Sequence, residues 1–118
     1  MRLRRDITRY AEGFIGAKYK YGGESPSSGF DCSGFTVFVM DAYGVGLNRT
    51  STSQSAMGKK IPLHRAQAGD LVFFSRRGKV NHVALVDANT DEGVMIIHST
   101  SSRGVIRENL STSTYWKP

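Results

Sequence analysis

The first part of the chain places apolar residues at the spacing of amphipathic helices. In residues 6–17 they recur at i, i+3, i+4, i+7 and i+8, which puts on one helix face the side chains of Ile7, Tyr10, Ala11, Phe14 and Ile15. The same spacing returns after residue 31 in Phe35, Phe38, Val39, Ala42 and Tyr43, and Gly44 is a typical C-terminal stop. We expect two helices here, joined by a loop over the glycine- and serine-rich residues 21–30.

A third, shorter helix is predicted by a capping motif. Ser51-Thr52-Ser53-Gln54 matches the capping box, in which a hydroxyl residue and a Glu or Gln three positions later satisfy each other's backbone N–H groups. We therefore expect a short helix over residues 52–57, ended by Gly58.

After Pro62 the pattern changes to short apolar runs rich in Val, Ile and Phe, which predict β-strands. The runs cover residues 70–75, 80–88 and 94–99, with a fourth at 104–107, and turn-forming residues separate them. Helices followed by an antiparallel meander indicate an α+β fold. A chain of 118 residues has room for one core, so we expect a single domain over residues 1–118.

Composition and charge narrow the classes of protein that remain. Hydrophobic residues make up 39% and charged residues 22%, which is typical of a globular chain. The net charge is +6, and residues 1–20 carry six basic against two acidic groups. That excess suits an anionic partner such as nucleic acid, acidic lipid or a cell-wall polymer, or it is simply a solvated helix face. Arginine and aromatic residues are not interleaved as in RNA-binding proteins, so we expect no nucleic acid.

Membrane and export signals are also weak. No apolar run approaches the ~18 residues that cross a bilayer, so we expect no transmembrane segment. The basic start, Met1 to Arg5, resembles that of a signal peptide, but Asp6, Thr8 and Arg9 interrupt the apolar stretch that should follow. We therefore expect no export signal within this sequence.

Cys32 is the one cysteine, which excludes internal disulfides and zinc sites built on several cysteines. It lies where the glycine-rich loop becomes a helix, and the positive end of the helix dipole favours thiolate there. Backbone N–H groups at a helix start also suit a developing oxyanion. These properties favour a nucleophile, whereas the general tendency of free cysteines is to be buried and inert.

A catalytic thiol needs a base, and two histidines fall in neighbouring predicted strands. If paired residue numbers sum to 180 or 182, His82 and His98 share a face as direct or diagonal neighbours, about 5 Å or 7–8 Å apart. An odd sum would separate them. In the nucleophile–base–orienter arrangement, Cys32 attacks, His82 takes its proton and His98 holds the ring of His82. The alternatives are ordinary sheet-edge histidines, or a zinc site of Cys32, His82 and His98; we interpret His64 as a surface residue.

Five ordered blocks of this sequence closely resemble the NlpC/P60 family of bacterial cell-wall cysteine peptidases. The nucleophile block is Tyr19-Lys20-Tyr21-Gly22-Gly23 with Gly29-Phe30-Asp31-Cys32-Ser33-Gly34-Phe35. The others are Arg49-Thr50-Ser51 with Gln54, Gly69-Asp70-Leu71-Val72-Phe73-Phe74, Asn81-His82-Val83-Ala84-Leu85-Val86, and Ile97-His98-Ser99-Thr100-Ser101 with Gly104-Val105. The order and spacing of these blocks, from Tyr19 to Val105, make the signal specific, and the resemblance covers about residues 6–110.

The resemblance implies a papain-like, circularly rearranged α+β fold with N-terminal helices packed on an antiparallel sheet. It implies a cysteine endopeptidase that cuts peptidoglycan stem peptides through an acyl-thioester, either next to γ-D-glutamate or at the D-alanyl–diaminopimelate cross-link. Cys32 would be the nucleophile, His82 the base and His98 the third polar residue. Tyr19 would lie near the oxyanion, and Asp31 and Ser33 would shape the pocket, although Asp31 is equally suited to cap the helix. No metal or other cofactor is implied.

The resemblance also implies a location in the periplasm, anchored at the outer membrane as a lipoprotein, or secreted, and we expect a monomer. Other classes stay open. One alternative is a catalytically idle peptide-binding module of the same fold. Another is a cysteine amidase or acyltransferase that acts on a different acyl substrate. An interbacterial toxin would use the same peptidoglycan chemistry.

Overall fold

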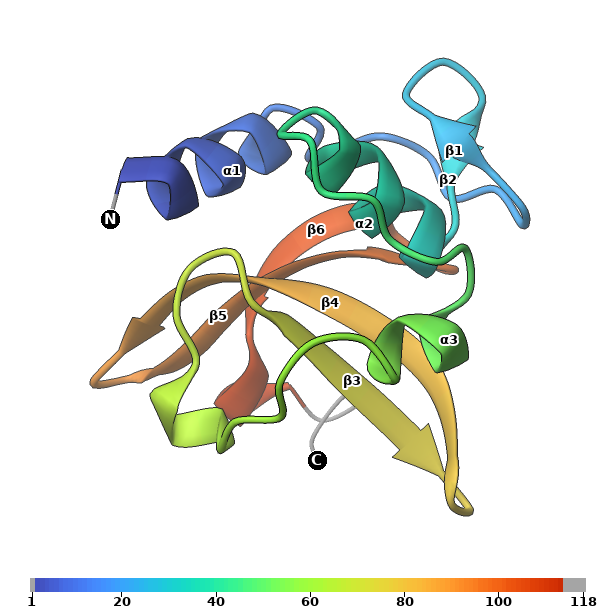
Figure 1. Ribbon diagram of the computed structural model, residues 1–118. Helices are drawn as coiled ribbons and strands as arrows, with labels where there is room; N and C mark the ends of the chain where they lie inside the picture. The colour runs from blue at the N-terminus through green and yellow to red at the C-terminus, as the bar shows by residue number, and fades with distance from the viewer. Residues whose placement is uncertain (1, 114–118) are drawn as a thin grey trace.

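A four-stranded antiparallel sheet forms the second half of the chain, and helices α1 and α2 lie over one of its faces (Figure 1). The computed structural model describes residues 2–113. The sheet has the order β3-β4-β5-β6 and consists of β3 (Leu71–Arg76), β4 (Lys79–Thr90), β5 (Gly93–Thr100) and β6 (Gly104–Asn109). The remaining elements are α1 (Arg2–Glu12), the two-residue strands β1 (Glu24–Ser25) and β2 (Gly29–Phe30), α2 (Cys32–Asp41), α3 (Ser51–Ser55), η1 (Leu63–Arg65) and η2 (Leu110–Thr112). The predicted α+β architecture is confirmed.

Each face of the sheet has its own apolar cluster, as expected from the alternation of side chains along a strand. On the helix face, Leu85 and Ile97 pack with Phe35 and Val39 of α2 and with Ile7 of α1. The opposite face is covered by the η1 and η2 segments and is filled by Phe74, Ala84, Val86, Ile96 and Leu110 among others. Burying both faces of the sheet fixes β4 and β5, the strands that carry the two histidines.

Two helices begin or end elsewhere than predicted. The first helix was expected at residues 6–17 but ends at Glu12, because Gly13 is a poor helix former and the next backbone groups turn to β6. There, Gly16 N–H donates to the Val105 carbonyl over 2.9 Å and Val105 N–H donates to Ala17 over 3.0 Å. Phe14 still packs against the core, whereas Ile15 is 45% exposed.

The capping box lies one residue earlier than predicted. Thr50 is the N-cap of α3, its hydroxyl accepts from Ser53 N–H over 3.1 Å, and the Ser53 hydroxyl accepts from Thr50 N–H over 3.3 Å. Serine at the third helical position replaces the expected glutamine. Gln54 is therefore released from capping and turns into the interior, where only 1% of its surface is exposed.

The pairing of β4 with β5 contains an irregularity that decides where the histidines lie. Near the turn the paired numbers have an odd sum, as in Ala88 with Met95, but beyond a bulge at Asp87 the pairs Val86–Ile96 and Leu85–Ile97 sum to 182. The even sum places His82 and His98 on one face as diagonal neighbours, which is one of the two predicted arrangements. A β-bulge inserts a residue into one strand and so restores the register that the turn alone would lose.

Candidate active site

Asp31 caps helix α2 and thereby positions the residue that follows it, Cys32. The Asp31 side chain accepts a hydrogen bond from the Gly34 backbone N–H over 2.7 Å, and its backbone is extended as an N-cap requires. Its second oxygen accepts from the Gly22 N–H over 2.9 Å. The carboxylate thus joins the glycine-rich loop to the helix start, and Cys32 becomes the first helical residue.

Two glycines bring the loop close against the helix. A Cβ atom at Gly34 would collide with the carbonyl oxygen of Gly23, and a Cβ at Gly23 would collide with the carbonyl of Gly29. Only residues without a side chain permit this backbone approach. The spacing of Gly23, Gly29 and Gly34 around Cys32 therefore has a steric cause, and it fixes the loop that borders the thiol.

Arg49 ties the segment before α3 to the helix start. Its Nη2 lies 3.0 Å from Asp31 Oδ2, its Nη1 donates to Ser33 Oγ over 2.8 Å, and its Nε lies 3.5 Å from Glu24. The pKa of Arg49 is raised, chiefly by its hydrogen bond to Asp31. Asp31 and Ser33 are thus engaged with Arg49 in the described structure, and they act on the site by holding this cation in place.

Gln54 of α3 also joins helix α2 to the segment that precedes α3. Its amide donates to the Asn48 carbonyl over 2.8 Å and to the Ser33 carbonyl over 3.3 Å, and its oxygen accepts from Thr36 over 2.9 Å. A buried amide is stable only when its donors and acceptor are paired in this way. Gln54 therefore secures α3 to α2 directly behind the nucleophile position.

The Cys32 thiol lies against β4, one residue after His82. Burial raises the pKa of Cys32, and hydrogen bonding from the Val83 backbone N–H opposes this without reversing it. The backbone N–H groups of Cys32 and Ser33 at the helix start also lower the pKa, in the predicted direction, but desolvation disfavours the thiolate more strongly. Burial also raises the pKa of Tyr19, with smaller contributions from Asp31 and Cys32, which places the phenol in the same neighbourhood.

The two histidines form a hydrogen-bonded chain that ends at a carboxylate. His82 Nε2 lies 2.7 Å from His98 Nδ1, and His98 Nε2 lies 2.6 Å from Glu108 Oε2. Phe74, directly across from His82 on β3, has its ring centroid 5.4 Å from that of His82. A second bulge, at Asn81, interrupts the β3–β4 pairing immediately before His82, and bulges of this kind redirect neighbouring side chains.

Both imidazoles are held in the neutral form. Burial, followed by the proximity of His98, lowers the pKa of His82 to about 3. Burial also lowers the pKa of His98, although its hydrogen bond to Glu108 acts in the opposite direction. These pKa directions favour a neutral imidazole and a protonated thiol in the resting protein. His82 would then act as a general base that accepts the proton during the reaction, unlike a preformed thiolate–imidazolium pair.

The structure brings the predicted residues Cys32, His82 and His98 to the region where the start of α2 meets β4 and β5. His64 lies exposed in η1, as predicted. Two further residues were missed as site residues. Arg49 stood in the quoted Arg49-Thr50-Ser51 block, so a signal existed for it, whereas Glu108 lies in a polar run with no motif and is found only through strand pairing.

Within residues 2–113, no group of three or more His, Cys, Asp and Glu side chains is arranged to hold a metal ion. The helices of the same region are too short or too polar to span a bilayer.

An antiparallel sheet that carries histidines, with a helix that begins at a cysteine packed on it, defines a papain-like α+β domain. The sequence profile of the NlpC/P60 family matches residues 16–118, and the chain belongs to this family. It is 36% identical over 110 residues to the gamma-DL-glutamyl hydrolase of Bacillus subtilis strain 168, an alignment that covers 93% of this chain and 27% of that protein.

Solved structures agree with this assignment. An NlpC/P60 family protein from Bacillus cereus ATCC 10987 superposes with a TM-score of 0.85 at 34% identity, covering 96% of this chain and 37% of that one. The NlpC/p60 domain of the peptidoglycan hydrolase SagA gives a TM-score of 0.77 at 34% identity, covering 89% and 87%. The chain therefore spans about a quarter of its Bacillus subtilis relative but nearly all of an isolated NlpC/P60 domain.

Proposed function

We propose that this protein is a cell-wall cysteine endopeptidase that hydrolyses peptidoglycan stem peptides. The bond would lie between γ-D-glutamate and the diamino acid, or at the D-alanyl–diaminopimelate cross-link. The observation that carries the proposal is the juxtaposition of a helix-start cysteine with a buried, hydrogen-bonded histidine pair. Support comes from the names of similar proteins, a gamma-DL-glutamyl hydrolase and a peptidoglycan hydrolase. Such a substrate places the enzyme in the periplasm, at the outer membrane or outside the cell.

The chemistry begins with proton transfer from the Cys32 thiol to His82. Because His82 Nε2 is engaged by His98, Nδ1 is the nitrogen assigned to this transfer. The sulfur then attacks the scissile carbonyl, and the C–N bond breaks as His82 returns the proton to the leaving amine. Water, deprotonated by His82, next attacks the thioester; the acid is released and the thiol is regenerated.

The oxyanion that forms during each attack needs donors. Backbone N–H groups at the start of α2 and the Tyr19 hydroxyl are assigned to it, since Tyr19 shares the neighbourhood of Cys32. Arg49, fixed by Asp31 and Ser33, is assigned to anionic groups on the acyl side of the substrate, because guanidinium suits carboxylate recognition. Ser33 and Asp31 then contribute to the pocket through Arg49.

The test is digestion of intact sacculi and purified stem peptides, followed by mass spectrometry of the products. The wild-type protein should cleave one defined bond, Cys32→Ala should be folded and inactive, and iodoacetamide should inhibit. Loss of activity with EDTA but not with iodoacetamide would contradict the thiol mechanism. A well-folded wild-type protein that cleaves nothing would instead favour the peptide-binding module or an amidase or acyltransferase with another acyl group.

A further inference from the structure

Glu108 reaches the histidine pair from the edge strand β6. It pairs with Ile96 of β5, and His98 pairs with Ile106. Since alternate residues of a strand share a face, Glu108 and His98 are diagonal neighbours on the same side of the sheet. His98 is fully buried, while the Glu108 side chain is 17% exposed and its other oxygen lies 3.8 Å from Arg103 Nη2. The Glu108 carboxylate thus lies between the buried imidazole and the exposed Arg103.

The Glu108 carboxylate determines the direction of both hydrogen bonds that link His82, His98 and Glu108. An ionised carboxylate only accepts, so His98 Nε2 carries the proton. A neutral imidazole has one N–H, which leaves His98 Nδ1 as the acceptor from His82 Nε2–H. His82 then carries its single proton on Nε2, and the lone pair on its Nδ1 is the basic one.

We propose that Glu108 is a positioning residue that sets the tautomers of both histidines so that His82 Nδ1 faces the reaction as the base. The proposal rests on the proposed function for its catalytic meaning, but the tautomers are a property of the resting protein. When His82 receives the thiol proton, the imidazolium charge lies one imidazole away from the Glu108 carboxylate. Through the neutral His98, Glu108 thereby stabilises the His82 imidazolium, as an acidic third residue would.

The test compares Glu108→Ala and Glu108→Gln with Glu92→Gln, an exposed glutamate in the turn between β4 and β5. Nitrogen-15 NMR of the histidine rings should show Nε2–H tautomers for His82 and His98 in the wild type and mixed tautomers in Glu108→Ala. On a stem peptide, kcat of Glu108→Ala should fall by roughly 10- to 100-fold, as for other partners that orient an imidazole, with KM nearly unchanged. Glu108→Gln, whose amide oxygen still accepts, should recover part of the loss.

The proposal is overturned if the wild type shows either histidine protonated on Nδ1 at neutral pH, or if Glu108→Ala retains the wild-type tautomers and kcat. Because the NMR result needs no substrate, it stands apart from the proposed function. If the wild type cleaves no stem peptide yet shows these tautomers, the proposed substrate fails and the positioning role of Glu108 survives.

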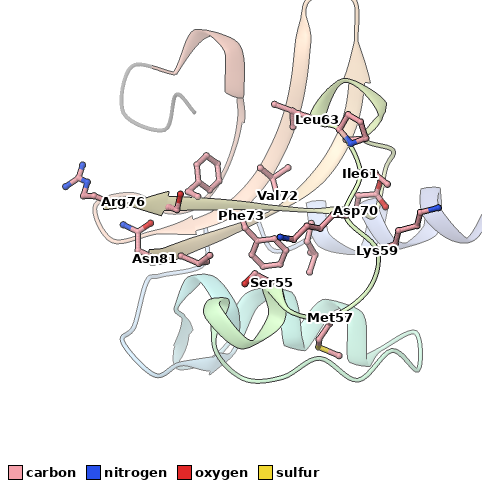
Figure 2. A pocket seen from close by; sticks show the side chains of 17 residues that line it. Ser55, Met57, Lys59, Ile61, Leu63, Asp70, Val72, Phe73, Arg76 and Asn81 are labelled. Carbon is pink, nitrogen blue, oxygen red and sulfur yellow. The ribbon is translucent and has the colours of Figure 1, made fainter. Parts of the chain in front are cut away.

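An independent feature is a cavity of about 760 Å³ between β3 and the segment that leads from α3 to η1 (Figure 2). Strand β3 is at one edge of the sheet, and its residues Leu71 to Arg76 line this cavity. Three large apolar side chains that line it are each at least 39% exposed: Met57, Ile61 and Leu63. Exposed apolar side chains that lie together in this way are typical of binding sites. Edge strands beside apolar pockets are suited to an added, extended peptide.

The charges around this groove favour an acidic occupant. Lys59, Lys60 and Arg76 line it and are exposed, and the one carboxylate among the lining residues, Asp70, is already paired with Arg4 over 2.8 Å. The groove also reaches the catalytic strand: Val80 and Asn81, which line it, immediately precede His82.

We infer that the groove binds the leaving-group side of the substrate as an extended, acidic peptide along the edge of β3. This assignment rests on the proposed function. His82 must reach the leaving nitrogen, and the groove residues Val80 and Asn81 immediately precede His82, so the chain beyond that nitrogen is assigned to the groove.

The test uses two stem peptides, one ending shortly after the scissile bond and one extended by acidic residues. The double variant Lys59→Glu/Lys60→Glu should raise KM for the extended peptide about tenfold, equivalent to about 1.4 kcal/mol, and leave the short one unchanged. Reversal of two exposed charges on α1, Arg5→Glu/Arg9→Glu, is the matched control. Equal KM changes for both peptides, or an equal effect of the control, would overturn the inference.

Binding separates this inference from the proposed function. Calorimetry of Cys32→Ala with the extended acidic peptide should show binding that weakens with salt and is lost in Cys32→Ala/Lys59→Glu/Lys60→Glu. If the wild type cleaves neither peptide but this binding pattern appears, the groove assignment holds and the hydrolase proposal fails. If Cys32→Ala does not bind the extended peptide and the wild type cleaves both peptides with equal KM, the groove assignment fails and the hydrolase proposal stands.

Discussion

The two halves of the site are polar in opposite ways. At the start of α2, charged groups face each other: Asp31 and Arg49 form an ion pair whose side chains are 15% and 35% exposed. On the sheet, His82 and His98 are buried and neutral, and they are held by a chain of hydrogen bonds that ends at the Glu108 carboxylate. Charges are thus kept where water solvates them, and the groups that exchange protons lie where a charge is costly.

This difference shows what each half is suited to do. In the helix half, the ion pair of Asp31 and Arg49 holds the frame around Cys32, and the Arg49 guanidinium suits recognition of an anionic substrate. The sheet half is suited to proton transfer, because burial lowers the pKa of His82 and keeps this imidazole neutral in the resting protein. Changes in the sheet half should therefore affect the chemical step, and changes in the helix half should affect the shape and binding of the site.

The largest expected effect comes from the sheet half. His82→Ala removes the base, and kcat/KM on a cleavable stem peptide should fall by about 10²- to 10⁴-fold while the circular dichroism spectrum stays unchanged. His64→Ala, at an exposed position in η1, is the matched control and should be fully active. Comparable losses in both variants would mean that the buried pair has no special role.

In the helix half, Gly34→Ala should chiefly disturb folding. The new methyl group would collide with the Gly23 carbonyl, and overpacking of this kind costs about 1–3 kcal/mol of unfolding free energy. Gly46→Ala has open space around it and should leave stability nearly unchanged. Urea denaturation of both variants checks this, and equal midpoints would show that the loop can move away from the helix.

Arg49→Gln should have a smaller effect, confined to the use of substrate. It removes the bonds to Asp31 and Ser33, so KM should rise about tenfold, the equivalent of about 1.4 kcal/mol, with little change in thermal midpoint. Arg65→Gln, an exposed arginine of η1, serves as the control. A fall in kcat at constant KM would assign Arg49 to the chemical step and weaken the division between the halves.

The smallest expected effect at neutral pH comes from the protonation of His82, which occurs only at lower pH. Because the pKa of His82 is lowered to about 3, the acid limb of kcat/KM should lie well below the ordinary histidine value of 6.5. The unfolded chain binds a proton near that ordinary value while the folded one does not, so unfolding free energy should decline as pH falls from 6.5 toward 3. His82→Gln should lose part of this decline. An acid limb centred near 6.5 would show a solvated His82.

Local signals in the sequence were sufficient for much of this fold and site. The N-cap at Asp31, the stop of α2 near Gly44 and the four strands follow from side-chain chemistry within a few residues, and the structure confirms them. The same local rules placed the cap of α3 at Ser51 instead of Thr50, since both are hydroxyl residues and only the tertiary position of Gln54 distinguishes them.

Other features depend on contacts far apart in the sequence. The bulge at Asp87, which sets the histidine register, has no local motif, so two registers remained equally plausible from sequence. Glu108 meets His98 only because β6 pairs with β5. The raised pKa of Cys32 depends on burial against β4, which outweighs the helix-start effect that favours thiolate.

The most direct test of the central claim is to trap the covalent intermediate on Cys32. The protein is mixed with a stem peptide, quenched in acid within the first turnover, and analysed as intact protein and as peptic fragments by mass spectrometry. We predict a mass increase equal to the acyl part of the substrate, located on the fragment that contains Cys32 and absent from Cys32→Ala. Hydrolysis that persists in Cys32→Ala, with no acyl adduct on the wild type, would contradict it.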